Sequence, residues 1–141
     1  MSGTGGELRL QLPHPLVAEN GSLFAEDFVA QGRGQGIAFD YSAGSIGYLD
    51  SIIASLREQN VTADRVADVL FGFGAYLGEA VLRSTGGAWV AAGPTTGRSS
   101  FPIVVRLGSG VTCNPLDRPF TALADGERAS LAAFYAEYVR L

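Results

Sequence analysis

Residues 61–92 read VTADRVADVLFGFGAYLGEAVLRSTGGAWVAA, and the fold class can be inferred from this segment. Its apolar residues recur at the spacing of one face of a helix, at Val66, Leu70, Phe73, Leu77 and Val81. Thr62 is placed to cap this helix and Gly86-Gly87 to end it. From Ala88 to Ala92 the pattern becomes extended. A long apolar helix followed directly by a strand predicts an α+β domain with this helix at its centre.

The flanking segments predict the remaining elements. Ser42 is placed to cap a helix that ends near Gln59, with a buried stripe of Ile46, Leu49, Ile53 and Leu56. Strands are predicted over 101–107 and 111–114, joined by a glycine-containing hairpin turn. A last helix is predicted from Asp125 to Arg140, with an apolar stripe at Leu131, Phe134, Tyr135 and Tyr138. The predicted order is two helices, a three-stranded antiparallel meander and a C-terminal helix.

Residues 1–36 are predicted to form a flexible arm, and residues 37–141 a single α+β domain. Within the arm, the alternation of polar residues and leucines over 7–12 suits an edge strand, either added to the meander or paired elsewhere. Residues 22–31 suit a short helix capped by Ser22. The glycines of 32–36 then form a flexible link.

The composition excludes several classes of function. All ten basic residues are arginine, so chemistry that needs a lysine Schiff base is excluded. The arginines are dispersed and the net charge is −4, which argues against nucleic-acid binding. His14 is the only histidine and Cys113 the only cysteine, so no His/Cys zinc site can form within one chain. We expect no metal and no cofactor, with His14 on the surface and Cys113 in the core.

The chain is also expected to be a soluble cytoplasmic protein. Its longest nearly apolar run, 69–78, is about half the ~20 residues that a membrane-spanning helix needs. The N-terminus has neither a basic start nor an apolar signal core. These features predict no contact with a membrane.

Two glycine-rich segments resemble nucleotide-binding loops without the expected context. Residues 92–99 have arginine where a phosphate-binding loop has lysine, and a strand follows where a helix is needed. Gly72, Gly74 and Gly78 have the wrong spacing for a dinucleotide-binding loop and lie within the long helix. Glycine weakens a helix interior, so these three predict close packing of another element or a bound group.

The polar residues of the long helix form the candidate site. Asp68, Gly72, Tyr76, Glu79 and Arg83 fall on one stripe, and Glu79 and Arg83 are spaced for an i, i+4 ion pair. One interpretation is a solvated face carrying a salt bridge. The other is a groove floored by glycine and rimmed by Tyr76 and Glu79.

Three further motifs add residues to the candidate site. GAYLGE at 74–79, GGAWV at 86–90 and VRLGSGV at 105–111, followed by Asn114-Pro115, resemble small bacterial domains of unknown function. The resemblance covers the chain from about residue 39 and implies a bacterial cytosolic protein. It adds Trp89, Arg106 and Asn114 to Tyr76 and Glu79 as residues to test. Trp89 and Arg106 could also stack across neighbouring strands.

Three functional hypotheses remain open. The first is a noncatalytic protein-interaction domain, immunity-like or adaptor-like, that binds through the N-terminal arm. The second is a small-ligand-binding domain or a carboxylate-using enzyme with its site around Glu79. Asp68 cannot be the second acid, because eleven helical positions at ~1.5 Å each separate the two; another acid such as Asp117 would have to approach. The third is a homodimer whose interface is the glycine face.

Overall fold

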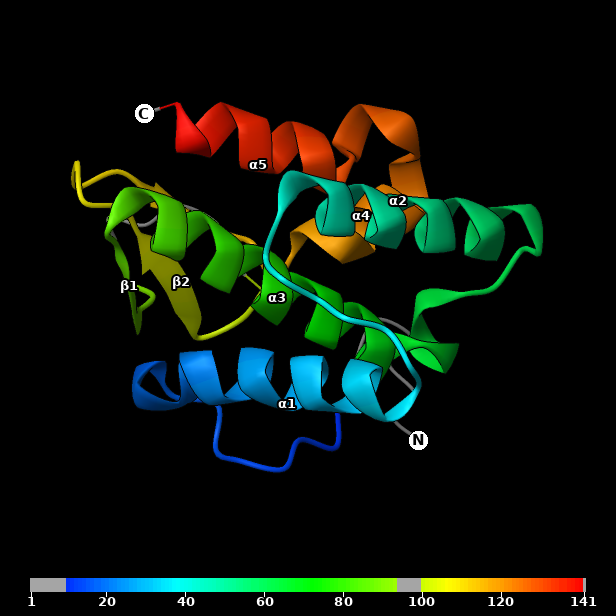
Figure 1. Ribbon diagram of the computed structural model, residues 1–141, viewed down its shortest axis with the longest axis horizontal. Coiled ribbons are helices and arrows are strands. Elements are labelled where there is room, and N and C mark those ends of the chain that lie inside the picture. The colour runs from blue at the N-terminus through cyan, green and yellow to red at the C-terminus, as the bar shows by residue number, and fades with distance from the viewer. Residues whose placement is uncertain (1–9, 94–99, 141) are drawn as a thin grey trace.

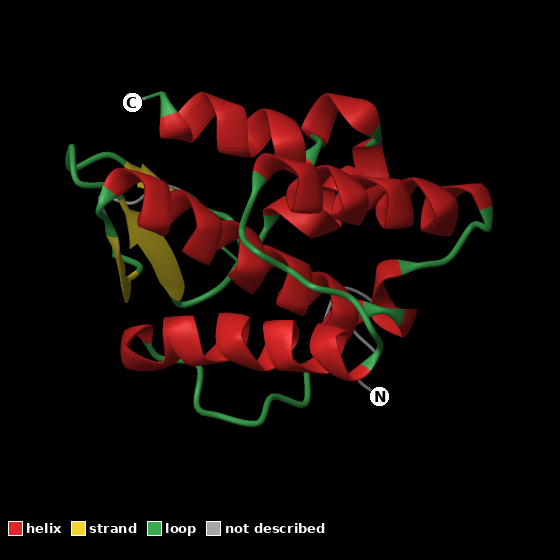
Figure 2. Ribbon diagram, viewed as in Figure 1, coloured by secondary structure: helices red, strands yellow, loops and turns green. Residues whose placement is uncertain are grey.

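The computed structural model describes residues 10–93 and 100–140. Its helices and strands are α1 (Gly21–Gly34), α2 (Ala43–Glu58), α3 (Ala67–Thr85), β1 (Ala88–Ala91), β2 (Ile103–Arg106), β3 (Thr112–Cys113), α4 (Arg118–Asp125) and α5 (Leu131–Val139). Short 3₁₀ turns occur at Ala18–Asn20, Ala63–Arg65 and Glu127–Ala129. The predicted α+β class is confirmed (Figure 2).

Helix α3 is the central element, as its apolar pattern predicts. It packs against α1 on one side and against α4 and α5 on the other, while α2 packs against α4 and α5 (Figure 1). Three residues of its predicted stripe, Leu70, Leu77 and Val81, have no exposed surface. A helix that is covered from both sides has to be apolar around most of its circumference.

The helix ends follow local capping chemistry. The Ser42 side chain accepts a hydrogen bond from the Ser45 N–H, which confirms the predicted start of α2. Gly86 ends α3 with a left-handed φ of 79°. The start predicted at Thr62 is wrong by several residues: Ala63–Arg65 forms a 3₁₀ turn, and α3 begins at Ala67 without a side-chain cap.

The three strands form the predicted antiparallel meander in the order β1-β2-β3. Trp89 lies opposite Val105, and Ala88 lies opposite Arg106. Because neighbouring residues of a strand face opposite sides of the sheet, Trp89 and Arg106 are on different faces. The predicted stack between these two residues is therefore wrong.

The prediction of close packing at the glycines of α3 is confirmed. A Cβ at Gly74 would lie 2.8 Å from the Leu116 Cα, and one at Gly78 would lie 2.4 Å from the Trp89 ring. The elements that approach so closely belong to the same chain. This face of α3 is therefore covered within the chain, which disfavours it as the interface of a homodimer.

Helix α1 is part of the core, which differs from the prediction of a flexible arm over residues 1–36. Its predicted helical segment is confirmed, with Phe24 and Ala25 buried within it. The predicted cap and link are wrong: Ser22 lies inside the helix, which starts after Asn20 and continues to Gly34. The Phe24 ring packs edge-on against Phe71 of α3. The predicted edge strand is not confirmed: residues 10–12 pair with no strand, and residues 7–9 lie outside the described residues.

The C-terminal helix predicted from Asp125 begins six residues later, at Leu131, and a helix that was not predicted, α4, precedes it. Gly126 has φ 87° and ψ −153°, which ends α4, and α5 begins only at Leu131. The Ser130 side chain caps α5, and both carboxylate oxygens of Asp50 in α2 accept N–H bonds from its first residues at 2.8 and 2.9 Å. A cap supplied by a residue 81 positions earlier cannot be read from local spacing.

Two sequence-based interpretations fall on segments outside the described residues. Most of the glycine-rich loop at 92–99 belongs to the segment 94–99, and the Gly/Ser-rich start belongs to 1–9.

Candidate functional site

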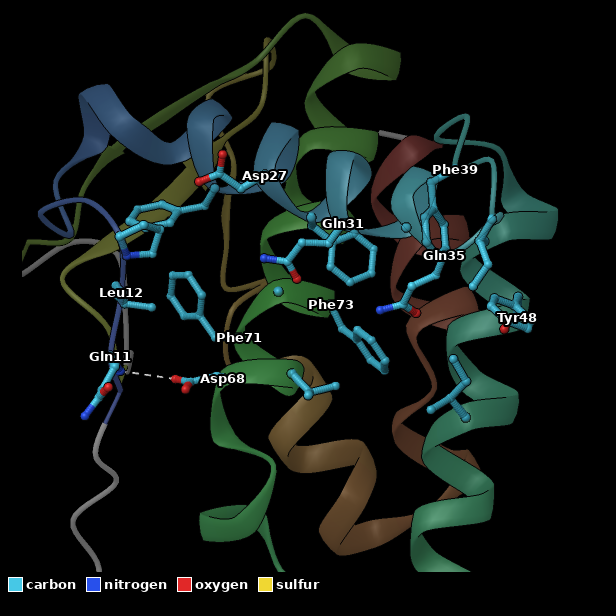
Figure 3. Close-up of a pocket in the computed structure, with 18 residues that line it drawn as sticks. Gln11, Leu12, Asp27, Gln31, Gln35, Phe39, Tyr48, Asp68, Phe71 and Phe73 are labelled. Atoms are coloured by element: carbon cyan, nitrogen blue, oxygen red, sulfur yellow. Dashed lines mark hydrogen bonds between the residues drawn. The ribbon is translucent and has the colours of Figure 1, made fainter.

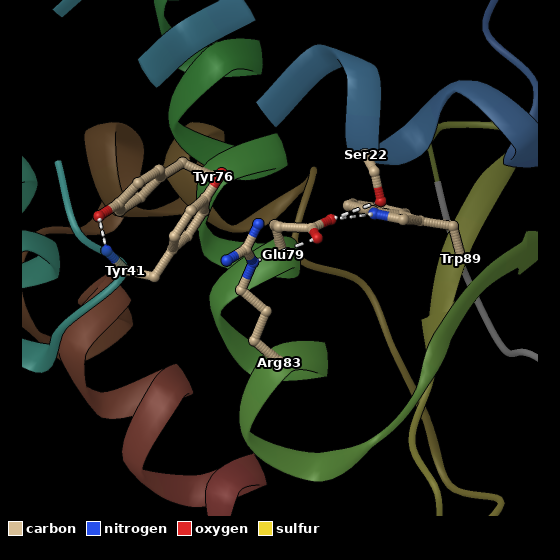
Figure 4. Close-up of polar contacts among 6 residues, drawn as sticks. All are labelled: Ser22, Tyr41, Tyr76, Glu79, Arg83 and Trp89. Atoms are coloured by element: carbon tan, nitrogen blue, oxygen red, sulfur yellow. Dashed lines mark hydrogen bonds and ion pairs between the residues drawn. The ribbon is translucent and has the colours of Figure 1, made fainter. Parts of the chain in front are cut away.

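The carboxylate of Glu79 lies at the junction of α1, α3 and β1. One oxygen, Oε1, accepts hydrogen bonds from Ser22 Oγ at 2.8 Å and from Trp89 Nε1 at 3.3 Å. The other, Oε2, pairs with Arg83 Nε at 3.4 Å, so the predicted i, i+4 ion pair is confirmed (Figure 4). Only 6% of Glu79 is exposed. A buried charge is tolerated when both of its oxygens have donors.

The cluster continues through two stacked tyrosine rings. The Arg83 guanidinium lies 4.1 Å from the centre of the Tyr41 ring, which stacks on Tyr76 with a centroid distance of 4.7 Å. The Tyr76 hydroxyl accepts the Tyr41 N–H and hydrogen-bonds to Ser45 Oγ at 2.6 Å. Burial raises the pKa of both tyrosines above the usual value of 10, so both rings stay uncharged at neutral pH. We call Ser22, Tyr41, Tyr76, Glu79, Arg83 and Trp89 the Glu79 cluster.

The two interpretations of this stripe of α3 each fit part of it. Its ends, Asp68 and Arg83, are exposed, whereas α1 and the segment before α2 cover its middle and leave Tyr76 with no exposed surface. Tyr76 and Glu79 do not rim an open groove, because both are buried, and a Cβ at Gly72 would lie 2.9 Å from the Phe28 ring of α1. The Glu79 cluster therefore joins α1, α3, β1 and the segment before α2, and most of its polar atoms bind one another.

The other three candidate residues, Trp89, Arg106 and Asn114, lie in different parts of the structure. Trp89 joins the Glu79 cluster, whereas Arg106 is exposed on the opposite face of the sheet. Asn114 follows β3 and lines a small polar hollow with Asp117 and Arg118. The structure thus brings together four of the six predicted residues: Tyr76, Glu79, Arg83 and Trp89.

Cys113 lies in the core, as predicted. Burial raises the pKa of its thiol to about 12. A thiol that stays protonated at neutral pH is a poor nucleophile. Cys113 therefore acts as a small apolar core residue.

An apolar groove of about 370 Å³ opens between α1, the first half of α3, and α2. Its lining is rich in aromatic rings, namely those of Phe24, Phe28, Phe39, Tyr48, Phe71 and Phe73. Gln31 of α1 and Gln35, the residue after α1, project into it, and Gln11 and Leu12 form one end (Figure 3). We call this feature the aromatic groove.

The aromatic groove has acidic and apolar residues at its edges. Its only charged lining residues in the described part of the chain are Asp27 and Asp68. Asp27 pairs with His14 at 2.8 Å, so His14, which was predicted on the surface, is only partly exposed, and Asp68 accepts the Gln11 N–H at 3.2 Å. Tyr48 and Val69 remain 45% and 46% exposed at the rim. Exposed apolar side chains beside a concave apolar surface are characteristic of binding sites.

Sequence reasoning found only Asp68 and Gly72 of the aromatic groove, because four separate segments line it. A usable signal was Val69, an apolar residue of α3 that lies outside the buried stripe. A large apolar side chain on the polar side of an amphipathic helix indicates a contact beyond the core of the domain.

Comparisons with family models, with curated proteins and with solved structures give no match. Within residues 10–93 and 100–140, no helix is long and apolar enough to cross a membrane. The same residues contain no group of three or more His, Cys, Asp or Glu side chains placed to hold a metal ion.

Proposed function

We propose that the chain is a noncatalytic protein-interaction domain that binds its partner through the aromatic groove. The observation that carries the proposal is the groove itself, an aromatic hollow with Tyr48 and Val69 exposed at its rim. Protein interfaces are enriched in aromatic residues and centre on apolar side chains that insert into pockets. A bacterial cytoplasmic setting and an immunity-like or adaptor-like role belong to the same proposal.

The binding surface in this proposal differs from the N-terminal arm considered from the sequence. Helix α1 forms one wall of the groove and also contributes to the core. Removal of residues 1–36 would therefore damage the fold as well as the binding surface.

A small-ligand-binding domain is the second candidate, and the volume of the groove favours it. About 370 Å³ falls within the range of ~300–1,000 Å³ typical of small-molecule sites. This candidate places the ligand in the groove instead of beside Glu79. The carboxylate of Glu79 already has Ser22, Trp89 and Arg83 as partners, which disfavours its use as an acid or base on a substrate.

Photo-cross-linking in the source cell tests the first proposal. A photo-reactive benzoylphenylalanine replaces Val69 in one variant and Val111 in the other. Val69 lines the groove, whereas Val111 is similarly exposed (42%) at the end of the β2–β3 turn. We expect a discrete protein adduct from position 69 and none from position 111. Equal adducts from both positions would contradict the proposal, and a small molecule retained in place of a protein would favour the second candidate.

A further inference from the structure

We infer that the partner inserts a short apolar segment that carries lysine or arginine beside its apolar side chains. This inference rests on the proposed function of the aromatic groove and adds the chemistry of the partner. It combines the apolar lining, which requires apolar side chains, with the sign of the charges at the rim.

The described lining contains two carboxylates and no cation. Asp27 and Asp68 come from different helices, α1 and α3, and the apolar side chain of Leu12 lies between them at one end of the groove (Figure 3). Among the described residues, the arginines nearest in sequence to these two aspartates, Arg33 and Arg65, do not line the groove. A cation bound beside either aspartate would therefore meet a negative charge.

Both carboxylates can accept a further donor. The Asp27 side chain remains 44% exposed despite its pair with His14, and Asp68 is exposed although one oxygen accepts the Gln11 N–H. Each carboxylate has two oxygens and about four lone-pair positions. A lysine or arginine of the partner can therefore bind without displacing the existing contacts.

The net charge of the whole chain also favours a basic partner. A net charge of −4 attracts a basic segment and repels an acidic one. Apolar groups then determine affinity inside the groove, and the carboxylates at its end favour basic segments over acidic ones of equal apolarity. A segment with apolar anchors on one face fits the helix-in-groove or extended-peptide modes of recognition.

Selection from a phage-displayed library of random peptides tests the inference on the full chain. Peptides selected on the wild-type protein are then measured by fluorescence anisotropy against four variants. Val69→Gln and Val111→Gln form the first pair, one in the groove and one outside it. The second pair consists of two double variants that remove the same net charge. Asp27→Asn/Asp68→Asn removes it from the groove, and Glu58→Gln/Asp125→Asn removes it from exposed sites elsewhere. Circular dichroism verifies that each variant is folded.

We expect the selected peptides to be enriched in apolar residues next to lysine or arginine. Val69→Gln should weaken them about tenfold, from loss of an apolar contact, while Val111→Gln leaves affinity unchanged. Neutralising Asp27 and Asp68 should weaken binding by up to about fivefold for each carboxylate and flatten its dependence on salt. The control pair should change affinity by less than about twofold.

The possible failures are distinguishable. Peptides that need Val69 but show no basic enrichment and no response to the aspartate changes would overturn the inference and leave the proposed function standing. Peptides that bind Val69→Gln as well as the wild type, or failure to select any peptide, would count against both.

Discussion

Glu79 is a buried carboxylate whose charge is stabilised by the side chains that surround it. Ser22, Trp89 and Arg83 supply its donors, and they come from three different elements. Hydrogen bonds to charged groups contribute more than neutral ones, and the loss of one partner leaves buried donors unsatisfied. The contribution of Glu79 should therefore appear in the stability of the fold.

Glu79→Gln should lower the free energy of unfolding by about 1–3 kcal/mol, because an amide cannot accept from all three donors or pair with Arg83. Urea denaturation measures the change. The matched control is Glu58→Gln at the exposed end of α2, which should change stability by less than about 0.5 kcal/mol. Equal effects of the two changes would show that the cluster does not hold the elements together.

Cys113 should make stability depend on pH in the alkaline range. Its pKa is about 12 in the folded chain against an ordinary value of 9.0, so the unfolded chain releases the thiol proton first. The contribution of the protonated thiol to the free energy of unfolding is therefore fully present below pH 9. It falls by about 1.4 kcal/mol per pH unit as the pH rises from 9 toward 12.

Denaturation of wild type and Cys113→Ala at several pH values separates this effect from that of the tyrosines. The difference in stability between the two proteins should shrink as the pH rises above 9. A difference that stays constant to pH 11 would contradict the assignment.

The helices show how glycine has different roles in different surroundings. A Cβ at Gly74 of α3 would meet the backbone of Leu116, whereas one at Gly47 of α2 would have nothing within 4 Å. A glycine-to-alanine substitution should therefore change the stability of the protein in opposite directions at these two positions.

Gly74→Ala should destabilise the protein by about 1–3 kcal/mol, because the backbone of Leu116 has to move. Gly47→Ala should stabilise it by up to about 1 kcal/mol, because alanine favours the helix. Thermal unfolding of both variants measures the difference. A neutral or stabilising Gly74→Ala would mean that the segment after β3 does not approach α3 as closely as described.

The elements also show which parts of the fold local sequence can predict. α2 and the meander were predictable because caps, turns and apolar periods agree within each segment, and α3 because of its apolar period and its C-terminal glycines, although its N-cap was not. α4 was not, because a helix of eight residues depends on its contacts with α2 and α3 and not on its own propensity. The last helix was predicted to start too early, because Asp125 suits a helix cap by its residue type although Gly126 separates it from α5.

At the scale of the whole molecule, the candidate site was only partly predictable. The spacing of Glu79 and Arg83 predicted their ion pair, but Ser22, 57 residues before Glu79, could not be assigned to it. The aromatic groove depends in the same way on α1 lying beside α3. Residues brought together by tertiary packing leave no periodic signal in a single sequence.

The burial of α1 predicts that the chain does not tolerate loss of its N-terminal region. A fragment of residues 37–141 would expose the faces of Phe71 and Trp89 that α1 covers. We expect reduced helicity and no cooperative thermal transition by circular dichroism, because small domains have little stability to lose. Adding a peptide of residues 10–36 in trans should restore part of the helicity and part of the cooperative transition. Native-like, cooperative unfolding of the fragment alone would show that α1 is a separable arm after all.

Trp89 gives the protein a built-in optical reporter. It is the only tryptophan, it is 8% exposed, and its indole contacts the backbone of α1 at Gly21 and of α3 at Gly78. Its emission should be blue-shifted in the native state and move to the red when α1 separates from α3. Stopped-flow fluorescence on the unlabelled chain can therefore time the step at which these two helices meet during folding.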